Sequence, residues 1–209
     1  MGRDLNPQCK QCRRAGEKLF LKGERCNTPK CAMVKRNYPP GIHGPKGKSR
    51  PTEYGLQLNE KQKAKRQYGL LEKQFRLTFT KAKKEAGNTG ENFLKLLEMR
   101  FDNVIYRLGI ASSRKEARQL ISHGHFTIND KKVNIPSYQV RAGEVIKIKS
   151  NKKDAKIFKD LKEKLQKKEV PGWVNLDKNE IAAKILHAPD VSVLKPNFNL
   201  QMIVEYYSR

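Results

Sequence analysis

The sequence predicts an α+β protein in three parts, and three observations support this prediction. Four cysteines fall within the first 31 of 209 residues, a polar stretch of helix-favouring residues follows, and short alternating apolar segments begin near residue 126. We therefore expect a four-cysteine metal knuckle with a basic arm at residues 1–45 and a small helical domain at 46–92. A domain of helix-turn-helix and antiparallel strands is expected at 93–196.

The four cysteines, Cys9, Cys12, Cys26 and Cys31, follow the spacing C-x2-C-x13-C-x4-C. In a reducing compartment this spacing favours metal binding over disulfides, because two thiolates separated by two residues can reach one ion. We predict one structural Zn2+, since four sulfur ligands leave no position for a catalytic water. An iron–sulfur cluster uses the same ligands and is the alternative.

The stretch after the cysteines predicts an arm. YPPGIHGPKGKSRP (Tyr38–Pro51) contains four prolines and three glycines, so we expect an extended segment that becomes ordered against its partner. Gly47-Lys48-Ser49 imitates the end of a P-loop. The first glycine of that motif is replaced by Ile42, so we exclude ATP binding.

The middle of the chain predicts helices. Residues 52–87 are polar and helix-friendly and divide at Gly69, and a further helix starts at Thr89 or Asn92 and ends at Gly109. Apolar residues of this last helix recur near helical spacing, which predicts a side that faces the core.

Residues 111–149 predict one more helix and three or four short antiparallel strands. Ser112 or Ser113 begins the helix, with Glu116 placed for a capping box, and Gly124 ends it. Alternating apolar residues then predict strands at 126–128, 133–135 and 145–148, with a basic turn between the first two. Trp173 is expected to pack on this sheet.

Two C-terminal segments complete the prediction. Residues 150–169 predict a charged helix with Ile157, Leu161 and Leu165 on one side. Residues 197–209 predict a short helix that joins the helical domain, and a strand is the competing interpretation.

Composition excludes several classes of protein. Hydrophobic residues make up 37% of the chain, and the longest apolar run, Cys31–Val34, is far below the roughly 20 residues that a membrane helix needs. The first residues hold no stretch typical of a secretory signal. We expect a cytoplasmic protein with no membrane partner.

The charge points to a polyanionic partner. Lys and Arg number 45 against 21 Asp and Glu, a formal charge of +24, and each of the blocks 1–50, 51–100, 101–150 and 151–209 is net positive. Such a charge repels itself unless a polyanion neutralises it, and nucleic acid is the leading candidate. A generally adhesive surface is the weaker alternative. Candidate phosphate contacts near the cysteines and in the arm are Arg13, Arg14, Lys22, Arg25, Lys30, Arg36, His43, Lys46, Lys48 and Arg50.

The helix after residue 111 carries cations away from its apolar side, which makes it a candidate RNA-binding element. The stretch 99–146, MRFDNVIYRLGIASSRKEARQLISHGHFTINDKKVNIPSYQVRAGEVI, resembles the RNA-binding domain of the fourth protein of the small ribosomal subunit. CKQC…CNTPKC, the arm and the terminal VEYYSR resemble bacterial members of that family. The resemblance covers essentially the whole chain. Many bacterial members lack the four cysteines, and this sequence resembles the metal-bearing variant.

This resemblance implies binding to small-subunit (16S-type) ribosomal RNA at a multi-helix junction of the 5′ domain, as an early assembly protein. It also implies contact with the neighbouring fifth small-subunit protein, a place near the channel through which mRNA enters, and an effect on decoding accuracy; some members repress their own mRNA. The core RNA-binding motif would span about 99–160. The residues implied to face RNA, together with the basic turn, are Ser113, Arg114, Lys115, Arg118, His123, His125, Lys131 and Lys132. Ordinary turn packing is the alternative for the two histidines.

Two rival functions are weaker. Pseudouridine synthases carry the same small domain, and Arg100-Phe101-Asp102 imitates their catalytic Arg-Leu-Asp motif, but Asp102 is better placed as a helix cap. No further domain remains for a nucleotide pocket, so we expect a structural protein without a small-molecule substrate. A sequence-specific DNA-binding zinc protein would need side chains aimed at base edges, which lysine-rich surfaces do not favour.

Overall fold

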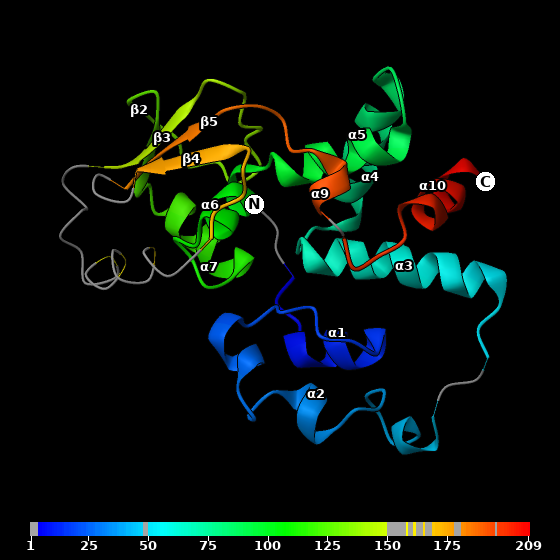
Figure 1. Ribbon diagram of the computed structural model, residues 1–209. Coiled ribbons are helices and arrows are strands. Elements are labelled where there is room, and N and C mark those ends of the chain that lie inside the picture. Colours follow the sequence, from blue (N-terminus) through cyan, green and yellow to red (C-terminus); the bar gives the residue numbers. More distant parts are fainter. Residues whose placement is uncertain are drawn as a thin grey trace. The chain divides into compact units, whose positions relative to one another are not determined.

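The computed structural model describes residues 4–47, 50–149, 158, 161, 165, 169–177, 181–194 and 196–209. The chain forms two compact units, one comprising Met1–Leu94 with Lys195–Arg209 and the other Lys95–Leu194 (Figure 1). Both ends of the chain therefore belong to the first unit. No helix in the described part of the chain is long and apolar enough to cross a membrane.

The first unit begins with short helical segments around the cysteines. Gly16 ends the first helix in the left-handed conformation, with φ 84°, which a residue without a Cβ adopts at little cost. Buried Leu19 and Met33 pack with Cys12 and Cys31 into a small core of their own. The elements are α1 (Gln8–Ala15), η1 (Gly23–Asn27), α2 (Ala32–Lys35) and η2 (Gly44–Lys46).

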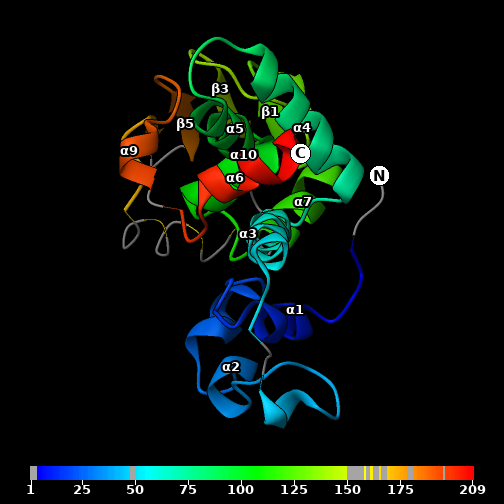
Figure 2. The same ribbon diagram turned by 90° about the vertical axis from the view of Figure 1, so that its right-hand side faces the viewer.

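Longer helices complete the first unit: α3 (Glu53–Gln67), α4 (Glu72–Lys84), the start of α5 (Thr89–Glu98), and α10 (Leu200–Ser208). The Thr52 hydroxyl caps α3 by accepting the Gly55 N–H at 3.2 Å. Gly69, with φ 62°, separates α3 from α4 as predicted. The C-terminal segment is a helix that packs across α3 (Figure 2), and the Asn199 side chain caps its start.

The second unit places helices beside an antiparallel sheet. Its strand order is β2-β1-β3-β5-β4, and the register pairs Ile128 with Ile146 and Ile146 with Ala183. The elements are α6 (Phe101–Leu108), α7 (Arg114–Ser122), β1 (Phe126–Ile128), β2 (Lys131–Lys132), β3 (Val145–Ile148), β4 (Val174–Asp177), β5 (Ala182–Ile185) and α9 (Val191–Leu194).

One apolar core joins α6, α7 and the sheet. Phe101, Ile105, Ile121 and Phe126 are fully buried there, and Trp173 packs on the sheet as predicted. Burial of each such side chain contributes about 1.5–3 kcal/mol, so this core fixes the position of α7 on the sheet.

The prediction of a single helix that ends at Gly109 is wrong, because the structure has two helices, α5 and α6, with a break at Arg100. The first N–H groups of α6 have partners outside the helix: Phe101 donates to the Tyr138 carbonyl at 2.9 Å and Asp102 to the Pro136 carbonyl at 3.1 Å. These bonds satisfy N–H groups that have no partner within α6, so a new helix can begin at this break. Arg100 is the N-cap residue, so the predicted capping role of Asp102 is also wrong.

The sheet differs from the prediction in its turn and in its number of strands. Asn129 and Asp130 have φ 47° and 62°, and they form a two-residue hairpin turn. The second strand therefore lies at residues 131–132, and the prediction of a strand at 133–135 is wrong. The strands β4 and β5 were not predicted. The predicted helix 150–169 lies largely outside the described residues, although Leu161 and Leu165 are buried in the core.

The arm is more ordered than predicted. Residues 44–46 form a 3-10 turn, and a Cβ added at Gly44 would come within 2.0 Å of the Pro39 carbonyl oxygen. Only a glycine permits this close approach, so part of the arm folds on itself without a partner.

Candidate nucleic-acid interface and cysteine pocket

The start of α7 is fixed by hydrogen bonds from its own side chains. The Ser113 hydroxyl accepts the Glu116 N–H at 3.3 Å, and the Glu116 carboxylate accepts the Ser112 N–H at 2.7 Å. The predicted capping box therefore forms, with its return bond one residue before the N-cap. Ser113 is buried, so its hydroxyl serves the helix end.

The predicted cationic side of α7 is only partly exposed. Lys115 is exposed, whereas Arg114 and Arg118 are half-buried, and the Arg118 side chain is 16% exposed. Sequence reasoning placed all three away from the apolar stripe but did not foresee the buried polar groups that hold the two arginines.

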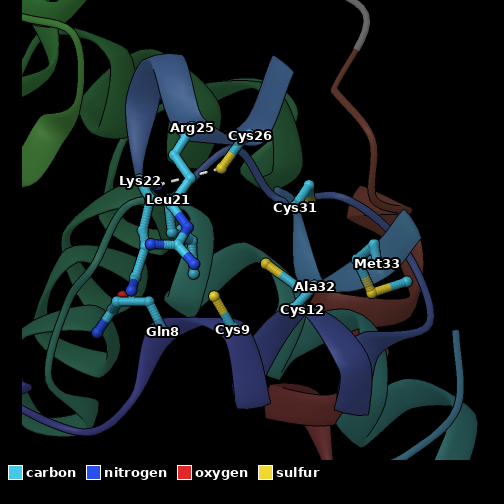
Figure 3. A pocket seen from close by; sticks show the side chains of 10 residues that line it. All are labelled: Gln8, Cys9, Cys12, Leu21, Lys22, Arg25, Cys26, Cys31, Ala32 and Met33. Atoms are coloured by element: carbon cyan, nitrogen blue, oxygen red, sulfur yellow. Dashed lines mark hydrogen bonds between the residues drawn. The ribbon is translucent and has the colours of Figure 1, made fainter. Parts of the chain in front are cut away.

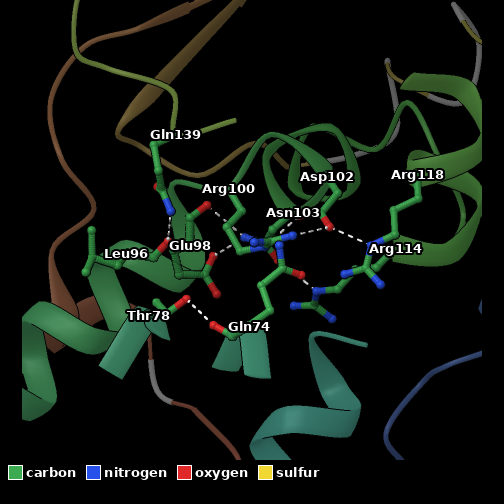
Figure 4. A network of polar contacts seen from close by, with 10 residues as sticks. All are labelled: Gln74, Thr78, Leu96, Glu98, Arg100, Asp102, Asn103, Arg114, Arg118 and Gln139. Atoms are coloured by element: carbon green, nitrogen blue, oxygen red, sulfur yellow. Dashed lines mark hydrogen bonds and ion pairs between the residues drawn. The ribbon is translucent and has the colours of Figure 1, made fainter. Parts of the chain in front are cut away.

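Asp102 is the first of these polar groups. Its buried carboxylate accepts hydrogen bonds from Nε and Nη2 of Arg100, at 3.2 and 3.1 Å, and from Nε of Arg118 at 2.6 Å (Figure 4). A buried carboxylate requires such partners. Two guanidinium groups around one carboxylate leave this cluster net positive.

Glu98 and Asn103 form the second group. The fully buried Glu98 carboxylate accepts two bonds from Arg107, at 2.9 and 2.8 Å, and one from Nδ2 of Asn103 at 2.8 Å. Oδ1 of Asn103 in turn accepts Nε of Arg114 at 2.8 Å. The Tyr106 ring lies 4.5 Å from the Arg114 guanidinium carbon, a cation–π contact.

The hairpin beside α7 adds exposed cations. Lys131 and Lys132 of β2 are both exposed, and Lys132 passes close to Gly124, where an added Cβ would lie 2.8 Å from its Cε. His123 is exposed. His125 is buried with its ring 5.5 Å from that of Phe158 in an edge-on contact, so packing accounts for its position.

In the first unit, Arg13 contacts the arm. Its Nε donates to the Tyr38 carbonyl at 2.9 Å, Nη2 donates to the Pro39 carbonyl at 3.1 Å, and the guanidinium lies over the Tyr38 ring. Arg13 thus holds the arm on α1. Lys48 lies outside the described residues. The other candidates in this unit are exposed: Arg14, Lys22, Arg25, Lys30, Arg36, His43, Lys46 and Arg50.

The four cysteines line one pocket. Cys9 and Cys12 project from α1 toward the segment that carries Cys26 and Cys31 (Figure 3). All four are free thiols, and the Lys22 N–H donates to Cys26 Sγ at 3.4 Å. Burial raises the pKa of the Cys12 thiol, and the neighbouring cysteines raise it further.

The pocket has the donor chemistry of a zinc site but not the closed geometry. Four sulfur atoms from two facing segments are the ligand set of a structural Zn2+. However, no group of three or more His, Cys, Asp or Glu side chains within the described ranges is placed to hold a metal. The side chains would have to draw together to form a site.

Sequence reasoning missed a cluster that holds α10. Glu72 accepts hydrogen bonds from Lys61 and Lys65, both at 2.8 Å, and from the Tyr207 hydroxyl at 3.0 Å. Burial would raise the pKa of Glu72, but these three bonds outweigh it and lower the pKa to about 2. Burial, with the bond to Glu72, raises the pKa of Tyr207. The sequence around Glu72 does not indicate this cluster, because 135 residues separate Glu72 from Tyr207.

Comparisons with known proteins cover both units. Residues 3–98 match the sequence model of the family described as the ribosomal protein S4/S9 N-terminal domain, and residues 99–146 match the S4 domain. Proteins named small ribosomal subunit protein uS4 are similar over 209 residues, which is the full length of both chains. Those from Heliobacterium modesticaldum, Syntrophomonas wolfei and Thermus thermophilus are 52%, 51% and 48% identical.

Proposed function

The chain belongs to the bacterial ribosomal protein S4 family of the small subunit, and we propose that it binds a multi-helix junction in the 5′ domain of 16S-type rRNA as an early assembly protein. It is a structural, ribosome-bound protein that binds rRNA. The relatives' names bear out the prediction of a non-enzyme and set aside the pseudouridine-synthase alternative.

The arrangement around α7 carries this proposal. Lys115 is exposed on a helix whose arginines are held by buried acceptors, and Lys131 and Lys132 add charge on the adjoining hairpin. RNA junctions are recognised mainly through phosphates, 2′-hydroxyls and shape. Cations at fixed spacing on a rigid body suit that mode of recognition.

The proposed place on the ribosome includes two neighbours. The chain contacts the fifth small-subunit protein near the channel through which mRNA enters, and through this contact it contributes to decoding accuracy in the cytoplasm. The family resemblance supports this part of the proposal.

We further propose that Cys9, Cys12, Cys26 and Cys31 bind one structural Zn2+, with an iron–sulfur cluster as the alternative. Their position around one pocket and their C-x2-C-x13-C-x4-C spacing support the proposal. The small apolar core beside them cannot stabilise the module strongly, and a bound metal supplies folding free energy when its ligands converge.

Binding to rRNA fragments tests the site of action. The full chain is titrated with a transcript of the complete small-subunit rRNA and with separate transcripts of its domains. We expect the 5′-domain transcript to bind within about threefold of the complete rRNA, because the fragment retains the phosphates and shape that the protein contacts. Preferential binding to another domain would refute the proposed junction while leaving the family assignment intact.

A further inference from the structure

Two arginines of α7 are held by the protein before any RNA binds. Nε of Arg118 donates to Asp102 at 2.6 Å, and Nε of Arg114 donates to Asn103 at 2.8 Å. Both side chains are half-buried. A guanidinium is planar, so a bond at Nε together with the helix backbone sets the direction of its Nη edge.

The two acceptors are themselves fixed. The Asp102 side chain is 2% exposed and binds Arg100 through two bonds, and the fully buried Asn103 donates to both the backbone carbonyl and the carboxylate of Glu98. Both acceptors lie in the first turn of α6. The orientation of the two guanidinium groups is therefore set by α6, a neighbouring helix, as Figure 4 shows.

The Tyr106 ring adds a third constraint on Arg114, with its centroid 4.5 Å from the guanidinium carbon. A stacked guanidinium cannot rotate out of its plane without losing this contact. Lys115 lies between the two arginines in sequence and is exposed. Its ammonium group is a compact charge that lacks the planar, bidentate donor geometry of a guanidinium. The helix thus presents two kinds of cation.

We propose that Asp102 and Asn103 are positioning residues for RNA binding. They hold Arg118 and Arg114 so that the Nη edge of each meets a backbone phosphate in the bidentate geometry that guanidinium and phosphate share. Because the side chains are already ordered, binding costs less conformational entropy. This inference rests on the proposed rRNA-binding function and deepens it by assigning roles to two residues that do not touch RNA.

Arginine-to-lysine variants test the proposal while keeping the charge. Affinity for the 5′-domain rRNA transcript is measured for Arg114→Lys, Arg118→Lys and the matched control Arg141→Lys, an exposed arginine in a turn. We expect each α7 variant to bind about tenfold more weakly, with an unchanged slope of log K against log salt, and the control to bind within about twofold of the wild type. Equal affinities for all three variants would overturn the proposal.

A double-mutant cycle tests whether Asp102 acts through Arg118. Asp102→Asn is expected to weaken binding about three- to tenfold with an unchanged salt slope, and to add almost nothing in the Arg118→Lys background. A purely structural role for Asp102 would weaken binding equally in both backgrounds, which would overturn the proposal. Circular dichroism checks that each variant is folded. If Asp102→Asn does not fold, Asn103→Ser combined with Arg114→Lys supplies the corresponding cycle for the other positioning residue.

The wild-type titration separates this inference from the proposed function. A wild type that does not bind small-subunit rRNA refutes both. A wild type that binds, with lysine variants that match the Arg141→Lys control, refutes only the positioning role.

Discussion

The carboxylate of Glu72 connects three elements of the first unit. Lys61 reaches it from α3, and Tyr207 reaches it from α10. Its pKa is about 2 in the folded protein and 4.5 in the unfolded chain. Because the folded pKa is the lower one, the stabilisation is complete above about pH 4.5 and is lost as the pH falls toward 2.

Removing the Tyr207 hydroxyl should therefore have an effect that depends on pH. We expect Tyr207→Phe to lower the free energy of unfolding by about 1 kcal/mol at pH 7, because a hydrogen bond to a carboxylate is lost. The difference from the wild type should shrink as the pH falls toward 2, because protonation of Glu72 weakens the bond to Tyr207 in the wild type and the variant has no such bond to lose. Denaturant unfolding at both pH values measures it. Tyr38→Phe, which keeps an aromatic ring beneath Arg13, is the control, and a pH-independent difference would contradict the account.

The cysteines permit a second test at the level of single residues. We expect Cys9→Ser combined with Cys26→Ser to abolish the binding of one Zn2+ and to reduce amide protection in residues 4–47, because metal binding supplies folding energy there. Protection of residues 99–148 should not change, since they belong to the other unit. Elemental analysis and hydrogen exchange provide the two measurements. A wild-type protein that is purified without metal, and whose protection zinc does not alter, would refute the ligand assignment.

Single-residue patterns predicted some local features and missed others. The Ser113–Glu116 capping box was visible because its partners are three residues apart. The bonds from Arg118 to Asp102 and from Tyr207 to Glu72 could not be read from the sequence, because folding brings those residues together.

Among the elements, α7 carries the cationic side chains that we assign to RNA binding. Reversing the charge of Arg114 and Arg118 would place carboxylates beside Asn103 and Asp102, so such variants would test stability as well as binding. Lys115, which is exposed, offers a cleaner substitution.

We expect Lys115→Glu to weaken binding to the 5′-domain rRNA transcript about tenfold and to make the salt slope shallower by about one, because one phosphate contact is lost. The melting temperature should change little, since the side chain is exposed. Glu116→Ala removes the acceptor of the Ser112 N–H instead, so it serves as a control for effects on the stability of α7. An unchanged salt slope for Lys115→Glu would show that this side of the helix does not face RNA.

Elements with strong local signals could be predicted, whereas those defined by distant partners could not. Gly69 marks a helix boundary by its own backbone conformation. The break at Arg100 depends on the carbonyls of Pro136 and Tyr138, which lie far along the chain. The strands β4 and β5 are defined by their pairing with each other. A segment of four residues is too short to show a clear apolar alternation in the sequence.

At the scale of the whole molecule, the chain consists of two compact units, and the first is completed by residues from both ends. The net charge of +24 is by itself enough to indicate a polyanionic partner. Which cations would face that partner could not be derived from charge alone, because Arg13 holds the arm and Arg114 and Arg118 bind buried acceptors.

Sedimentation of the untagged chain tests most directly whether its cationic surfaces fasten it to ribosomal RNA. A lysate is separated on a sucrose gradient in moderate salt, with the wild type compared against a variant that combines Lys115→Glu, Lys131→Glu and Lys132→Glu. We predict that the wild type migrates with small ribosomal subunits and that the variant is depleted from them. A wild type that remains at the top of the gradient, or a variant that migrates with small subunits as fully as the wild type, would contradict the account.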